Sequence, residues 1–174
     1  MEVAAELRKP VARQWLDGMA GTNLLLGAVV GLIHPTSFKT GAECVSAIGN
    51  NENIQKAENL GELMKIWTSP FPAASVINNR DTPIHRDNGA TYASMDCLTS
   101  VGPFAIGKFI VPAIGLEFLF RSGTVICLLG RVLPHAAEVT GERMCYAQYL
   151  RENILSTLGV AEPAFIAIQD LTNF

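Results

Sequence analysis

Short β-prone segments follow one another at a regular spacing through the second half of the chain. The residue pattern changes at Ser69-Pro70-Phe71-Pro72, and from there on strand-like runs alternate with turn residues. The runs are AASVI, TYASMDCLTS, GKFIVPAI, LEFLF, TVICLLG and RMCYAQYL. They lie about 10 residues apart, and several alternate apolar with polar side chains, which is typical of sandwiches and barrels rather than of parallel α/β sheets. This pattern predicts a jelly-roll core of about eight strands.

The first third of the chain has the periodicity of helices instead. Its apolar side chains recur every four positions, as on one face of a helix. They are Val3, Leu7, Val11 and Trp15. Pro10 is expected to begin or kink this helix, and further helices are expected over residues 22–33, 34–49 and around 58–67.

The length of 174 residues and the hydrophobic content of 49% suffice for one domain with a substantial core. We expect a single domain over residues 1–174. It would comprise a helical layer at 1–68, the jelly-roll core at 69–155 and a C-terminal segment at 156–174. The predicted fold class is α+β, with a double-stranded β-helix (jelly-roll or cupin-like) core and the N-terminal helices packed on one side.

Charge and cysteine content narrow the classes of function. The net charge of −3 predicts no broad polyanion-binding surface, so any nucleic-acid contact must come from a local patch. The four cysteines are too widely spaced for a zinc knuckle or a small disulfide framework, which indicates reduced core thiols in an intracellular protein. The most apolar run, residues 24–33, is about half of the ~20 residues that a membrane helix needs, so no membrane span is expected.

The segment PIHRDNGA places His85 two residues before Asp87. Residues i and i+2 of a strand share a face, so an imidazole and a carboxylate would lie side by side. A third ligand could come from His34 or from His135, and His135, after the run TVICLLG, is better placed. His34 precedes Pro35 and is expected to cap or pack a helix. Two histidines and one carboxylate suit non-haem Fe(II), because open positions remain for 2-oxoglutarate and dioxygen.

The far carboxylate of 2-oxoglutarate needs a fixed cation, ideally the fork of an arginine. Arg143, eight residues past His135 and at the head of the next strand, suits this role, and Arg151 is the second choice. Arg80 either binds the co-substrate or braces a turn. A kinase catalytic loop is excluded, because Tyr92 stands where such a loop has asparagine.

Three stretches together resemble a known family. IHRDNG, LEFLFRSGTVICLLGRVLPHAAEV and ERMCYAQYLREN are similar to the iron- and 2-oxoglutarate-dependent dioxygenases of the TET and J-binding-protein group, especially compact fungal-type members. The resemblance covers roughly residues 70–155. It implies that His85, Asp87 and His135 hold iron, that Arg143 binds 2-oxoglutarate, and that Arg80 assists. The DNA-reading insertions, cysteine-rich segment and basic tail of larger members are absent from this sequence.

The resemblance also implies a substrate. The expected reaction is oxidation of a methyl group on a nucleic-acid base, with 5-methylcytosine in DNA first and N6-methyladenine as a competitor. Methylated DNA and dioxygen would be the partners, and the location nuclear. Asn79, Asn88 and Tyr92 are candidate substrate contacts, although asparagines beside Gly and Asp also build turns. A dioxygenase acting on a small molecule or protein, and an inactive jelly-roll binding module, are the alternatives.

Overall fold

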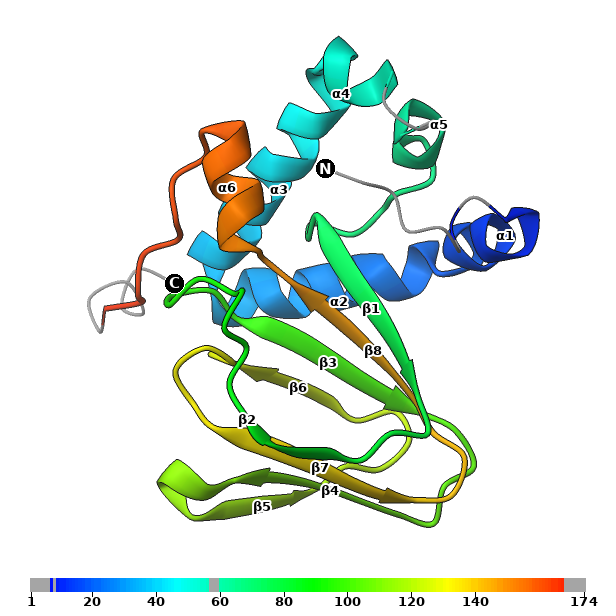
Figure 1. The fold of residues 1–174 in the computed structure, drawn as a ribbon, viewed down its shortest axis with the longest axis vertical. Helices are drawn as coiled ribbons and strands as arrows, with labels where there is room; N and C mark the ends of the chain where they lie inside the picture. The colour runs from blue at the N-terminus through cyan, green and yellow to red at the C-terminus, as the bar shows by residue number, and fades with distance from the viewer. Residues whose placement is uncertain (1–6, 8, 57–59, 168–174) are drawn as a thin grey trace. The chain divides into compact units, whose positions relative to one another are not determined.

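A computed structural model describes residues 7, 9–56 and 60–167 of the chain. The chain divides into two compact units, which are named here by their content (Figure 1). The helical unit comprises residues 1–72 and 153–174, and the β unit comprises residues 73–152. The single-domain organisation and the packing of helices on one side of the core stay predictions, and residues 168–174 of the expected C-terminal segment lie outside the described residues.

The helical unit begins with three consecutive helices and two short ones. They are α1 (Pro10–Gly18), α2 (Ala20–Ile33), α3 (Pro35–Asn50), α4 (Glu52–Lys56) and α5 (Leu60–Met64), and α6 (Glu152–Leu158) follows the β unit in sequence and belongs, from residue 153 on, to the helical unit. Proline stands at the first position of α1 and of α3, where its missing N–H costs no hydrogen bond. The expected helix starts at Val3 and Glu58 fall among residues that the structure does not describe.

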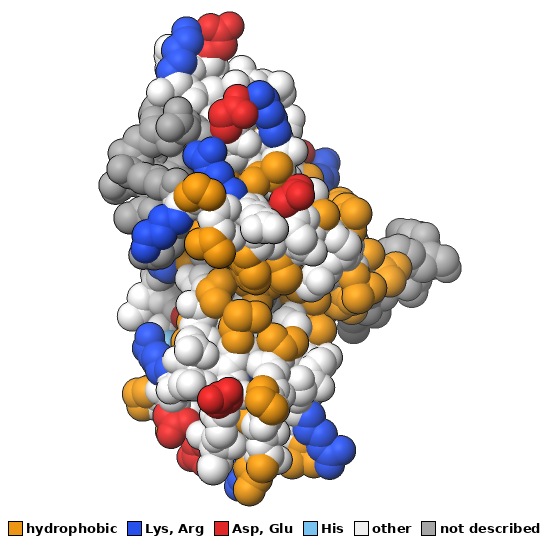
Figure 2. Space-filling model, turned by 90° about the vertical axis from the view of Figure 1, so that its right-hand side faces the viewer, with side chains coloured by type: hydrophobic (Ala, Val, Ile, Leu, Met, Phe, Trp, Pro, Cys, Tyr) orange, Lys and Arg blue, Asp and Glu red, His pale blue; other side chains and the backbone are white. Residues whose placement is uncertain are grey.

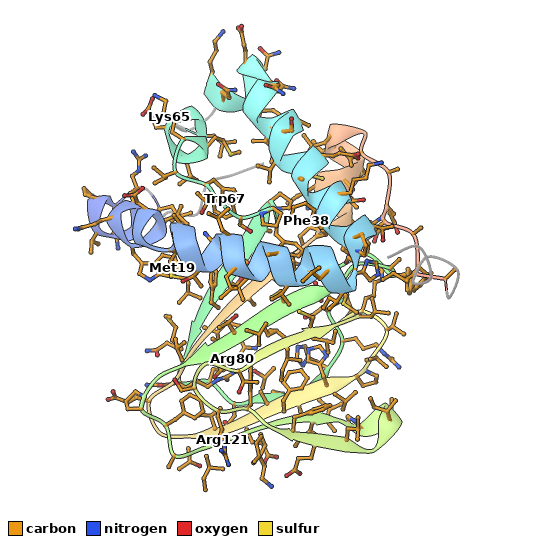
Figure 3. All side chains as sticks on the ribbon, turned by 180° about the vertical axis from the view of Figure 1, so that it is seen from behind. Met19, Phe38, Lys65, Trp67, Arg80 and Arg121 are labelled. Carbon is orange, nitrogen blue, oxygen red and sulfur yellow. The ribbon has the colours of Figure 1, made fainter. Side chains whose placement is uncertain are left out.

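His34 caps α3, as expected. Its Nδ1 accepts a hydrogen bond from the backbone N–H of Ser37 at 3.2 Å, which satisfies one of the unpaired N–H groups of the first turn. The Phe38 ring then packs against α2, where a Cβ added to Gly31 would lie 3.5 Å from it (Figure 3). No single described helix is long and apolar enough to cross a membrane, and only the bent pair of α1 and α2, with 52° between them, passes on length and composition.

The β unit consists of two antiparallel four-stranded sheets (Figure 1). The strands are β1 (Ala73–Asn78), β2 (Thr82–His85), β3 (Asp96–Val101), β4 (Ile106–Val111), β5 (Leu116–Leu119), β6 (Val125–Leu128), β7 (His135–Thr140) and β8 (Met144–Tyr149). One sheet has the order β1-β8-β3-β6 and the other β2-β7-β4-β5, so successive strands alternate between the sheets except at β4 and β5, which pair with each other in one sheet. This arrangement confirms the predicted jelly-roll core within an α+β protein.

An apolar core fills the interior of the β unit. Phe109 and Phe120 meet edge to face, with their ring centroids 5.5 Å apart, and both are almost completely buried. Val111, Leu128, Ala137 and Cys145 complete the buried cluster. Full burial of each large side chain contributes about 1.5–3 kcal/mol of stability relative to exposure. The cluster therefore supports the side chains that pack against it.

Two strands were not indicated by the sequence pattern, and both have a tertiary explanation. β2 contains Pro83 and is an edge strand bonded only to β7, a position in which proline is tolerated. β7 reads HAAEVT, which is poor in strand-forming residues, and its pairing on both sides with β2 and β4 stabilises it. The expected run 91–100 is a strand only from Asp96 onward.

Candidate metal centre

The register between β2 and β7 places two histidines opposite each other. His85 is the last residue of β2, His135 is the first of β7, and the two are direct cross-strand partners. Their ring centroids lie 4.3 Å apart, and Phe109 stacks on His135 at 5.5 Å. Opposed residues of antiparallel strands point to the same face, so both imidazoles enter the interior of the β unit together.

Asp87 joins this pair from the turn after β2. Its backbone N–H donates to the carbonyl of Gly130 at 3.0 Å, and its own carbonyl accepts from the N–H of Ala90. Its Oδ1 lies 3.6 Å from Nε2 of His85, and its Oδ2 lies 3.5 Å from Nε2 of His135. One ligand atom from each of the three residues lies within 4.8 Å of the other two, so they can hold one metal ion.

The hydrogen bonds of the two imidazoles fit metal binding. Nδ1 of His85 lies 3.0 Å from the Pro83 carbonyl, and Nδ1 of His135 lies 3.0 Å from the Leu133 carbonyl. A carbonyl oxygen only accepts, so each Nδ1 carries a hydrogen, and in the neutral form of each ring Nε2 presents its lone pair toward Asp87. Burial also lowers the pKa of His135, which favours the neutral imidazole that binds a metal. Two neutral imidazoles and one carboxylate are the donor set of non-haem Fe(II).

A second carboxyl group, Asp96, lies beside the metal ligands and was not indicated by the sequence. It is almost completely buried, and burial, followed by the nearby Asp87 charge, raises the pKa of Asp96 to about 8. A Cβ added to Gly130 would approach Oδ2 of both Asp96 and Asp87 closer than 3.0 Å. Gly130 therefore leaves room for the two carboxyl groups to lie side by side. An acidic residue inside an apolar strand run is the only local signal of this arrangement.

The substitution Gly130→Ala is expected to weaken metal binding about 10- to 100-fold, the usual effect of disturbing groups that orient a metal ligand. The added methyl must push the Asp87 or Asp96 carboxyl group aside, whereas the backbone of Gly130 needs no special conformation. Anaerobic Fe(II) titration of the purified variant measures the effect. Gly49→Ala, which meets no atom within 4 Å, is the matched control and should bind Fe(II) as the unmodified chain does.

Arg143 lies on the same interior, immediately before β8, and is 4% exposed. Its Nε donates to the Ser100 hydroxyl at 2.8 Å, and its guanidinium carbon lies 4.6 Å from the Phe120 ring centroid. Burial lowers its pKa, but a guanidinium remains charged at neutral pH. Within the described part of the chain, Arg143 forms no ion pair. A buried cation without a carboxylate partner favours binding of an anionic ligand.

These groups open into one cavity of about 460 Å³ inside the β unit. Of the residues predicted from the sequence, the cavity is lined by His85, Asp87, His135, Arg143, Arg80, Asn88 and Arg151. Arg80 stands just after the end of β1 (Figure 3). Tyr149 also lines the cavity, and so does Arg86, which was not indicated by the sequence. The exposed Arg151 places its guanidinium 4.7 Å from the Tyr149 ring centroid.

The structure does not bring Asn79 or Tyr92 to this cavity. Asn79 has a positive φ of 46°, and its side-chain oxygen accepts from the Arg143 N–H at 2.6 Å, so it holds the backbone from which Arg143 projects. Tyr92 is 57% exposed and stacks under Arg131, which also donates to the Ala90 carbonyl and pairs with Glu152. Tyr92 thus belongs to a cluster that fastens the loop after Asp87. Their contacts with substrate stay predictions.

Comparison with known proteins identifies the family of the chain. No curated protein matches the chain. Among solved structures, the chain is similar to one titled the structure of hydroxypropylphosphonic acid epoxidase from S. wedmorenis, with 18% identity and a TM-score of 0.32. That similarity covers 44% of this chain and 42% of the other. The Tet/JBP family model, described as the oxygenase domain of the 2OGFeDO superfamily, matches residues 8–152. The chain therefore belongs to the Tet/JBP family of oxygenase domains, whose superfamily uses Fe(II) and 2-oxoglutarate.

Proposed function

We propose that the chain is an Fe(II)- and 2-oxoglutarate-dependent dioxygenase that oxidises a methyl group on a nucleic-acid base, with 5-methylcytosine in DNA as the first substrate. The expected product is 5-hydroxymethylcytosine and, after further rounds, its more oxidised forms. One observation supports the mechanism above all others. A His-Asp-His donor set and a buried arginine, which has no carboxylate partner among the described residues, line the same cavity.

When bound, Fe(II) and 2-oxoglutarate supply the oxidising chemistry: dioxygen and 2-oxoglutarate are consumed, the methyl group gains one oxygen atom, and succinate and carbon dioxide are released. In this proposal, Arg143 binds the far carboxylate of 2-oxoglutarate. Ser100 and the Phe120 ring hold its guanidinium in place before the ligand arrives. Such preorganisation lowers the entropic cost of binding.

The mouth of the cavity carries groups suited to a base or its phosphate. Arg80, Arg86 and Asn88 are exposed residues that line the cavity and offer hydrogen-bond donors. Arg151 and Tyr149, at the end of β8, add a cation and an aromatic face, which are groups that contact phosphates and stack on bases. A target base must leave the duplex stack to reach the metal ligands, at a cost of a few kcal/mol.

The charge distribution limits this nucleic-acid contact to the cavity mouth. On the face shown in Figure 2, the Lys and Arg side chains are interspersed with acidic, apolar and uncharged ones, and the whole chain carries a net charge of −3. A protein that contacts few phosphates loses little affinity as salt concentration rises. We therefore expect a shallow salt dependence of duplex binding, which fluorescence anisotropy at several ionic strengths measures.

The substrate is tested by incubating the protein with Fe(II), 2-oxoglutarate and duplexes that carry 5-methylcytosine or N6-methyladenine, in parallel, followed by nucleoside mass spectrometry. We expect conversion of 5-methylcytosine, and no conversion by the His135→Ala protein. Loss of N6-methyladenine with 5-methylcytosine unchanged would mean that N6-methyladenine is the substrate, and the proposed mechanism would stand. Succinate formation on a small molecule or protein, with both duplexes unchanged, would remove nucleic acid from the proposal. Absence of succinate with every substrate would support an inactive binding module.

A further inference from the structure

Two cysteines face each other across neighbouring strands of the β unit. Cys97 on β3 and Cys127 on β6 are direct cross-strand partners. Three positions along the same ladder, the Ser100 N–H donates to the Thr124 carbonyl at 3.1 Å, so Ser100 turns its backbone groups toward β6. Bonded and non-bonded pairs alternate in an antiparallel ladder, so Cys97 and Cys127 form a non-hydrogen-bonded pair.

The non-hydrogen-bonded position brings the two side chains within reach of a covalent bond. Cα atoms of such pairs are about 4.5 Å apart, and disulfides bridge Cα separations of about 4.4–6.8 Å. Both sulfurs leave the same face of the sheet, because opposed residues share a face. No backbone shift is therefore required to join them.

The cysteine pair lies on the face of its sheet away from the metal cavity. Asp96 and Leu98, the neighbours of Cys97, both line the cavity, so Cys97 points the other way. Cys145 lines the cavity itself and so faces away from the pair. Cys44 belongs to α3 of the helical unit. Neither of these two is the strand partner of Cys97 or Cys127.

The two thiols differ in burial and in pKa. Cys127 is half-buried and reachable, whereas Cys97 is completely buried. A hydrogen bond from the Cys97 thiol lowers the pKa of Cys127, and the same contact, with burial, raises the pKa of Cys97. The shared proton thus stays on Cys97, and the thiolate, which reacts with oxidants, forms at Cys127.

We propose that Cys97 and Cys127 are a peroxide-responsive thiol pair that forms a reversible disulfide across β3 and β6. In the first step the Cys127 thiolate attacks one oxygen of hydrogen peroxide, the O–O bond breaks, and a sulfenic acid and hydroxide form. In the second step Cys97 sulfur attacks Cys127 sulfur, the S–O bond breaks, and the thiol proton leaves with the hydroxyl group as water. The pair loses two electrons and peroxide gains them, and a dithiol reductant reverses the change.

The test uses the metal-free chain of 174 residues and stoichiometric hydrogen peroxide, followed by thiol blocking and trypsin without reduction. Cleavage after lysine and arginine puts each of the four cysteines on its own peptide. We expect one linked species that joins residues 87–108 to residues 122–131, with the loss of two hydrogen atoms. Dithiothreitol before blocking should abolish it. Cys145→Ser, which removes a thiol from the cavity face, should leave the yield of this species unchanged.

The matched variants Cys97→Ser and Cys127→Ser separate the two roles. With Cys97→Ser, the sulfenic acid should persist on residues 122–131 and react with dimedone. With Cys127→Ser, peroxide should leave the Cys97 thiol of residues 87–108 unmodified, because this thiol is buried. Equal labelling of all four cysteines, a linked species that contains Cys145 or Cys44, or direct overoxidation of Cys127 without a linked species would overturn the proposal. None of these outcomes bears on the dioxygenase assignment.

Discussion

Replacing His135 with alanine is expected to abolish iron-dependent turnover while the protein stays folded. His135 is the only ligand candidate that β7 supplies to the cluster with His85 and Asp87, and two ligands cannot fix the geometry of a facial site. Changing a group that only orients a metal ligand lowers metal affinity about 10- to 100-fold, so removing the ligand itself should lower Fe(II) affinity more than about 100-fold. Succinate formation and anaerobic Fe(II) titration measure the loss.

Folding of the His135→Ala protein is checked by circular dichroism and thermal denaturation, because His135 is buried against Phe109. The control is His34→Ala, which removes a histidine that caps α3 and does not belong to the metal cluster. That variant should lose about 0.5–2 kcal/mol of stability and keep its turnover. Retained iron-dependent turnover in His135→Ala with His34 intact would mean that the third ligand has been assigned to the wrong residue.

Replacing Arg143 with methionine is expected to raise the concentration of 2-oxoglutarate required for half-maximal turnover by roughly 10- to 150-fold. Methionine keeps much of the apolar stem against Phe120 but removes the guanidinium fork, and charge-assisted hydrogen bonds contribute about 1.5–3 kcal/mol. Fe(II) affinity should change little, because Arg143 is not a member of the metal cluster. Steady-state kinetics at saturating iron and varied 2-oxoglutarate separate the two effects.

Arg151→Met is the matched control for Arg143→Met. Both arginines flank β8 and line the same cavity, but Arg151 is exposed whereas Arg143 is 4% exposed. An exposed guanidinium gains less from a carboxylate, because water and salt screen the interaction. We expect a much smaller rise in the 2-oxoglutarate requirement for Arg151→Met. A larger rise in the 2-oxoglutarate requirement for Arg151→Met than for Arg143→Met would mean that Arg151 binds the far carboxylate of 2-oxoglutarate.

The metal ligands show how much of the metal site local sequence pattern could predict. The spacing of His85 and Asp87 was sufficient to propose half of a metal site, because two residues two apart can meet within one short segment. The choice of His135 over His34 rested on its place after a predicted strand. Only the register of β2 and β7 makes His85 and His135 direct partners, and neither of these strands was predicted.

No sequence pattern within one segment indicated which residues lie around the metal ligands. Asp96 lies nine residues and Gly130 lies 43 residues after Asp87, and the side-by-side arrangement of the two carboxyl groups depends on how β3 and the turn after β6 meet. Asn79 was considered for substrate contact, and its side-chain oxygen also accepts a hydrogen bond from the Arg143 backbone N–H across the ends of β1 and β8. Such contacts join residues tens of positions apart, so no periodicity within one segment indicates them.

The sequence by itself determined the kinds of element and the chemistry available. Alternating apolar residues and turn signals are read within ten residues, and they were sufficient for six of the eight strands and for a helical first third. The tertiary structure alone decided which side chains meet. Strand order and register placed two histidines opposite each other, buried Arg143 in the lining of the same cavity with no carboxylate partner among the described residues, and paired Cys97 with Cys127. A register is a relation between distant segments, and a shift of one residue would turn each of these side chains to the other face of its sheet.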